Sequence, residues 1–104
     1  AASFAQAWNI DANKIPEALC DGHAGSNLLN DIFPRIVNRD FAPKGYASQI
    51  LKDLQMVSKL ANAKNTPTPM SSLTKQLFTI LVNSSQEKLN GTSIVKLFDS
   101  KENI

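Results

Sequence analysis

The stretch SQILKDLQMVSKLANA, residues 48–63, decides the fold class. Its apolar residues Ile50, Leu54, Val57 and Ala61 recur at i, i+4, i+7 and i+11, which is the period of an amphipathic α-helix. Two further apolar residues widen this stripe: Leu51 and Leu60. The pattern predicts one helix over the whole stretch, with the stripe packed against the rest of the domain.

The sequence after this helix predicts a second long helix and a short final one. Residues 65–69 hold two prolines and end the first helix, because a proline lacks the backbone donor that a helix interior needs. A helical period then runs from about Met70 to Leu89, and Asn90-Gly91 supplies its stop. Thr92 or Ser93 is expected to cap a last turn. The apolar residues of that turn are Ile94, Val95, Leu97 and Phe98.

Before residue 48, proline, glycine and helix-capping residues divide the chain into short helices. Residues 40–46 form a loop by their proline and glycine content. Ser26 is expected to cap an earlier helix, and Pro34 should kink or end that helix. The apolar stripe expected on that helix is Leu28, Leu29, Ile32 and Phe33.

The first twenty residues predict two more helices. Asp11 is expected to cap a short helix through Leu19, with Ile15 and Leu19 facing inward. Residues 1–8 also favour a helix but have no capping residue before them, so we expect the chain to begin partway along a longer helix. Two aromatic residues share one face of that segment: Phe4 and Trp8. Residues 1–104 therefore predict a single all-α domain, a compact bundle of five to six helices.

Composition excludes several classes of protein. The net charge of the 104 residues is only +2, and the basic residues are scattered, which argues against a nucleic-acid partner. No apolar run approaches the roughly 20 residues that span a bilayer, so no membrane partner is expected. A single cysteine allows no internal disulfide and favours a reducing compartment, hence a cytoplasmic protein.

Cys20 and His23 are the only pair that suggests metal or nucleophilic chemistry. Structural zinc requires four ligands, and this pair supplies two. A thiol–imidazole nucleophile would also need an orienting group, which the neighbouring sequence does not provide. We therefore expect no metal site and no catalytic residue here. The favoured alternative is a buried Cys20 at a helix end beside a loop histidine.

Lys52 and Asp53 are the more informative charged pair. They lie early in the 48–63 helix, directly after the loop, and Lys52 projects from a different side than Ile50 and Leu54. A lysine there can present its ammonium to a polar or anionic ligand held by a neighbouring domain. From spacing alone, an ordinary solvated helix face is the favoured alternative.

An ordered set of segments resembles the C-terminal domain of the β-hydroxyacid dehydrogenase family, which includes 3-hydroxyisobutyrate dehydrogenase, 2-hydroxy-3-oxopropionate reductase and threonate dehydrogenase. The segments are Ala24-Gly25-Ser26, Arg39-Asp40-Phe41-Ala42-Pro43, Gly45-Tyr46, Leu51-Lys52-Asp53-Leu54, Pro67-Thr68-Pro69 and Gly91 to Phe98. The resemblance implies a helical domain like the C-terminal domain of 6-phosphogluconate dehydrogenase-like enzymes. It also implies that an N-terminal Rossmann domain and the catalytic lysine lie upstream of Ala1.

The resemblance further implies an enzyme that moves hydride between NAD or NADP and a small 3-hydroxyacid or its semialdehyde. Lys52 inherits a cofactor-contacting role, Asp53 and Tyr46 weaker ones, and the domain is expected to make homo-oligomer contacts. One departure stands out: many relatives place an aromatic residue eight positions before the aspartate, where this chain has Gly45 and the aromatic Tyr46 follows one residue later. The chain alone is expected to be inactive. The alternative is a stand-alone helical interaction module that binds a partner through the Phe4/Trp8 face.

Overall fold

The computed structural model describes residues 1–42, 44–86 and 89–99. This part of the chain is helical, and its only β-type pairing is an isolated bridge between Tyr46 and Asn90. The all-α class predicted from the sequence is confirmed. In chain order the elements are α1 (Ala2–Ala7), η1 (Ala12–Lys14), α2 (Ile15–Leu19), α3 (Asn27–Val37), α4 (Ala47–Ala63), α5 (Pro69–Leu81), η2 (Val82–Gln86, a π-helical turn) and η3 (Gly91–Phe98).

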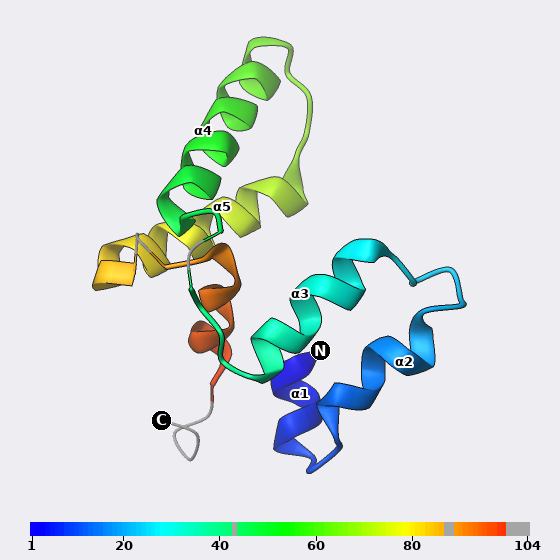
Figure 1. Ribbon diagram of the computed structural model, residues 1–104. Helices are drawn as coiled ribbons and strands as arrows, with labels where there is room; N and C mark the ends of the chain where they lie inside the picture. The colour runs from blue at the N-terminus through cyan, green and yellow to red at the C-terminus, as the bar shows by residue number, and fades with distance from the viewer. Residues whose placement is uncertain (43, 87–88, 100–104) are drawn as a thin grey trace.

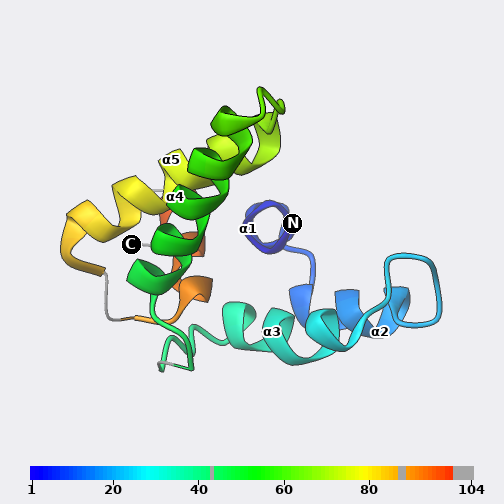
Figure 2. The same ribbon diagram turned by 90° about the horizontal axis from the view of Figure 1, so that it is seen from above.

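The helices gather into two lobes (Figures 1 and 2), one formed by α4, α5 and η3 and the other by α1, α2 and α3. In the α4–α5–η3 lobe, α4 packs extensively on α5. Its core consists of Ala47, Phe78 and Leu81, and the partly buried residues packed on it are Ile50, Leu51, Leu54, Val82, Ile94 and Leu97. Burial of this apolar surface is the main stabilising term of the fold.

The predicted helix over residues 48–63 is confirmed as α4, but its apolar stripe is only half covered. Ile50 and Leu54 pack on the core, whereas Val57 is 43% exposed and Leu60 is 70% exposed. The prediction that the whole stripe faces inward is therefore wrong for Val57 and Leu60, whereas Ala61 is partly buried. The reason is tertiary: the core contacts of α4 are concentrated in its first turns, where η3 and α5 both reach it.

Helix α3 begins as predicted, because the Ser26 hydroxyl accepts a hydrogen bond from Leu29 N at 2.9 Å. Pro34 neither ends the helix nor stops the ladder beyond it, since Asn38 N donates to Pro34 O at 2.9 Å. A proline removes only its own donor, so helical bonding resumes after it. Leu28, expected in the inward stripe, is 69% exposed.

Two predicted boundaries near the end of the chain are wrong. Helix α5 ends at Leu81 and passes into the π-helical turn, well before Leu89; residues 87 and 88 of the expected helix lie outside the described residues. The cap of η3 is Asn90, whose side chain accepts from Thr92 N at 3.0 Å. Thr92 and Ser93 themselves are buried inside η3. Asn is as good an N-cap as Ser or Thr, so propensity alone did not separate these candidates.

The α1–α3 lobe is built from short elements and small buried side chains. Asp11 caps η1 as expected, accepting from Asn13 N at 3.1 Å, and α2 follows directly. Leu19, predicted to face inward, is 41% exposed. The buried apolar positions of this lobe are Ala2, Ala5, Ala12 and Pro16.

A large apolar surface remains exposed on both lobes. The accessible surface is 7422 Å², against about 5,700 Å² for a typical folded monomer of this mass. Phe4 and Trp8 are each 70% exposed, and so is Leu60. Within the part of the chain that the structure describes, no helix has the length and apolarity to cross a bilayer.

Candidate cofactor-contact site

Lys52 and Asp53 lie on the outer side of α4. Ile50 and Leu54 face the core, and two residues turn about 200° around a helix axis, so Lys52 points away from both. Lys52 and Asp53 are exposed. Among the described residues neither side chain has an ion pair or hydrogen bond. The ammonium and the carboxylate are thus free to meet a group outside this domain.

Tyr46 stands at the N-cap of α4 and is 41% exposed. Its backbone N donates to Gln49 Oε1 at 3.3 Å, which satisfies one donor at the start of the helix. Within α4, Asp53 lies about 100° around the axis from Lys52, so the two side chains leave the helix on adjoining sides. Tyr46 precedes the helix in an extended conformation and lies at its N-terminal end.

A small polar pocket of about 210 Å³ adjoins Tyr46 at this end of α4. Its lining residues are Lys44, Gly45, Tyr46 and Gln49. At Gly45 an added Cβ would meet no atom within 4 Å. A side chain at position 45 would therefore point into open space, and its absence leaves Tyr46 as the aromatic residue of this pocket. Pro43, in the same loop, lies outside the described residues.

Backbone pairing with a distant segment fixes the start of α4. Ala47 N donates to Leu89 O at 2.8 Å, Gly91 N donates to Gly45 O at 3.1 Å, and Ala47 is fully buried. A Cβ on Gly91 would overlap Cδ1 of Ile50, so a larger residue at this position would force the Ile50 side chain to shift. Sequence reasoning used Asn90-Gly91 only as a helix stop and missed this role. An Asn-Gly pair signals a turn, but not which segment the turn contacts.

Cys20 and His23 both lie at the surface, just after α2. The Cys20 thiol donates to Glu17 O at 3.2 Å. The expectation of a buried Cys20 is wrong, because α2 ends at the surface of its lobe. Across residues 1–42, 44–86 and 89–99, no three His, Cys, Asp or Glu side chains gather as metal ligands.

The arrangement of helices is that of a dehydrogenase helical domain. It superposes on the crystal structure of 3-hydroxyisobutyrate dehydrogenase from Salmonella typhimurium with a TM-score of 0.84 and 21% sequence identity, covering 92% of this chain and 34% of that chain. Residues 1–98 match the family described as NAD-binding of NADP-dependent 3-hydroxyisobutyrate dehydrogenase. The chain belongs to this family, as the sequence resemblance predicted.

Curated relatives agree. The chain is 35% identical over 94 residues to the protein named "Probable 3-hydroxyisobutyrate dehydrogenase-like 3, mitochondrial" of Arabidopsis thaliana, covering 90% of this chain and 28% of that protein. It is 26% identical over 106 residues to L-threonate dehydrogenase of Cupriavidus necator, covering 98% of this chain and 36% of that protein. The chain thus spans about a third of the length of the curated relatives it matches.

Proposed function

We propose that this chain is the helical C-terminal domain of an NAD(P)-dependent 3-hydroxyacid dehydrogenase. A Rossmann domain earlier in the same polypeptide would bind the cofactor, which supplies hydride transfer between its nicotinamide and the hydroxyacid or semialdehyde. The catalytic lysine would also lie outside residues 1–104. The observation that carries the proposal is the family match over residues 1–98, together with an exposed, unpaired Lys52 on the outer side of α4.

Within that enzyme, Lys52 would bind and orient the cofactor rather than move a proton. An unpaired ammonium offers three donors and no acceptor, which suits ribose hydroxyl and carboxamide oxygens. Asp53 beside Lys52 and Tyr46 at the N-terminal end of α4 would contribute weaker contacts to the cofactor. Backbone pairing of Ala47 with Leu89 holds this helix start in place, so the contact needs little reordering.

The test is Lys52→Met in the full-length enzyme, which keeps the length of the side chain and removes its charge. Loss of one charge-assisted hydrogen bond should raise the KM for the nicotinamide cofactor by about tenfold or more. Lys59→Met is the matched control, because Lys59 lies two turns further along the same exposed side of α4. Equal cofactor KM values for the two variants would contradict the role of Lys52. Turnover by residues 1–104 alone would contradict the domain assignment.

Self-association of the whole protein is part of the proposal. Exposed apolar surface of this extent on a small domain marks interaction sites, and homo-oligomers are the commonest soluble assemblies. Sedimentation equilibrium of the full-length protein should show an oligomer. The compartment is proposed to be the cytoplasm, in keeping with the single exposed thiol.

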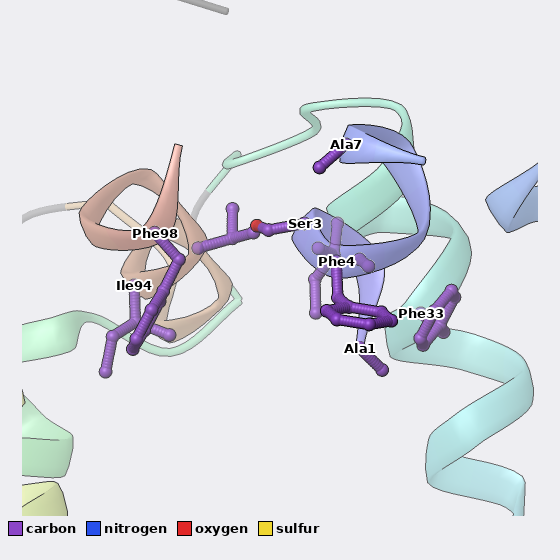
Figure 3. A pocket seen from close by; sticks show the side chains of 10 residues that line it. Ala1, Ser3, Phe4, Ala7, Phe33, Ile94 and Phe98 are labelled. Carbon is purple, nitrogen blue, oxygen red and sulfur yellow. The ribbon is translucent and has the colours of Figure 1, made fainter. Parts of the chain in front are cut away.

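A second candidate is a stand-alone helical interaction module. Phe4 lines an apolar hollow of about 560 Å³ between α1, α3 and η3 (Figure 3), where its ring lies beside Phe33 and across from Ile94 and Phe98. Trp8 adds a second exposed aromatic ring on α1. The intact mass of the endogenous protein decides between the two candidates. A mass close to 11.3 kDa supports the module, and a mass about three times larger supports the enzyme.

A further inference from the structure

The apolar hollow between α1, α3 and η3 is walled mainly by side chains that cannot form hydrogen bonds (Figure 3). Two of its rings are widely exposed, Phe4 by 70% and Phe98 by 56%. Ser3 also lines the hollow, but its Oγ atom is buried. The rest of the wall consists of alanine, valine, isoleucine and phenylalanine side chains, among them Phe33 and Ile94. A macromolecule that docks here must therefore present apolar side chains.

The second half of α4 carries an exposed apolar ridge, which consists of Met56, Val57 and Leu60. These side chains are 55%, 43% and 70% exposed. Residues at i, i+1 and i+4 lie within about 100° around a helix axis, so the three share one side of α4. Helices that dock into apolar grooves use anchors of this spacing. The end of α4 extends away from α1 (Figure 1), and the ridge does not line the hollow of its own molecule.

The regions that carry the hollow and the ridge have opposite charge. Among residues 1–42, the exposed charged side chains are five acidic and one basic: Asp11, Glu17, Asp21, Asp31, Asp40 and Lys14. Among residues 47–81, on α4 and α5, they are one acidic and three basic: Asp53, Lys52, Lys59 and Lys64. Lys59 directly precedes Leu60 in the ridge, and Lys64 follows it by one turn. Opposite charge favours the approach of one such surface to the other.

The exposed area fits an occupant that covers both surfaces. The chain exposes about 1,700 Å² more than a typical folded monomer of its mass. A standard interface takes about 800 Å² from each partner, so the excess corresponds to two interface patches. A second copy of the chain brings a ridge for the hollow and a hollow for the ridge. Such a reciprocal contact closes around a two-fold axis and leaves neither patch exposed.

We propose that the α4 ridge of a second copy of this chain docks into the apolar hollow, and that the contact is reciprocal. Leu60 enters the hollow between Phe4 and Phe98, and Lys59 and Lys64 face the acidic α1–α3 lobe. This inference rests on the self-association proposed above and names its surfaces. Lys52 lies about 12 Å before Leu60 along the axis of α4, so the proposed cofactor contact stays open.

The test is sedimentation equilibrium of residues 1–104 at micromolar concentration, which should give twice the monomer mass of 11.3 kDa. Phe4→Asp and Leu60→Asp, both at positions 70% exposed, should each raise the dimer dissociation constant by about tenfold or more. Ile10→Asp is the matched control: it is 55% exposed, lies outside both surfaces and should dimerise like the unaltered chain.

A monomeric unaltered chain, or a dimer that withstands both Phe4→Asp and Leu60→Asp, would overturn the inference. Either result would leave the role of Lys52 standing, because that role is measured separately by the cofactor KM of Lys52→Met.

Cross-linking identifies which surfaces meet. Ala7→Cys places a thiol at the hollow and Leu60→Cys places one on the ridge, each combined with Cys20→Ser to remove the native thiol. A short bismaleimide should link a mixture of the two variants into mixed dimers. Leu60→Cys mixed with Ile10→Cys, in the same background, is the control and should give a lower yield. Equal yields from the two mixtures, or efficient linking of Leu60→Cys to itself, would overturn the reciprocal arrangement.

Discussion

The two lobes of this molecule bury different kinds of side chain. The α4–α5–η3 lobe has a core with the large residues Phe78 and Leu81, while the α1–α3 lobe buries mainly alanines and one arginine, Arg35. Large buried side chains contribute about 1.5–3 kcal/mol each, and alanines far less. The α4–α5–η3 lobe therefore has a core of its own. The α1–α3 lobe packs on it through η3, which contacts both α1 and α3, and the Arg39–Asp99 pair adds a polar contact between the lobes.

The largest expected effect is in the apolar core. Leu81 is 1% exposed, and Leu81→Ala should lower the free energy of unfolding by about 3–5 kcal/mol in urea titrations, because it leaves a cavity. The matched control is Leu28→Ala in the other lobe, at a position 69% exposed, which should change stability by less than about 0.5 kcal/mol. Similar losses for both would show that the lobes do not differ in this way.

Removing the ion pair between the lobes should have an intermediate effect on stability. Arg39, after α3, pairs with Asp99, after η3, through two hydrogen bonds of 3.0 and 2.5 Å, and the Asp99 side chain is only 12% exposed. Arg39→Gln should cost about 1.5–3 kcal/mol by the same urea measurement. The control is Lys44→Gln, whose 4.0 Å pair with Asp31 is exposed and should contribute less than about 1 kcal/mol. If Arg39→Gln lowers the free energy of unfolding no more than this control, the Arg39–Asp99 pair does not stabilise the contact between the lobes.

The smallest expected effect lies within the α1–α3 lobe. Ser26→Ala removes the N-cap of α3 and should cost about 1 kcal/mol. Ser72→Ala in the first turns of α5 serves as the control, since Ser72 is exposed and its hydroxyl makes no described hydrogen bond. Amide hydrogen exchange should show faster exchange confined to α3 in Ser26→Ala. Faster exchange across α4 as well would mean that the lobes unfold as one unit.

Local signals predicted the helices well. Ser26, Asp11 and Pro69 act through contacts within a few residues, and each lies at the start of a helix, where the sequence placed it. Errors arose where a distant partner decides burial. The sequence could not show which positions of α4 its neighbours α5 and η3 cover, so the exposure of Val57 and Leu60 was missed.

The candidate site was predictable only in part. Lys52 could be placed on the outer side of α4 from helical period alone, and the structure has it exposed there. Its role in binding the cofactor remains a prediction from resemblance. A cavity lined by Arg35 and Thr92 had no sequence signal, because these residues lie on α3 and η3 and line one cavity only in the folded chain.

The pairing of Ala47 with Leu89 and of Gly45 with Gly91 has a consequence for the order of folding. Helix α4, which carries Lys52, can form locally. The segment that fixes its position, Leu89 to Gly91, is synthesised much later. Closing that long loop carries an entropic cost before its contacts form, and such non-local contacts slow folding. During synthesis, α4 therefore leaves the ribosome before the segment that anchors it. The surface of α4 that carries Lys52 reaches its final position only when the segment leading into η3 pairs with the start of α4.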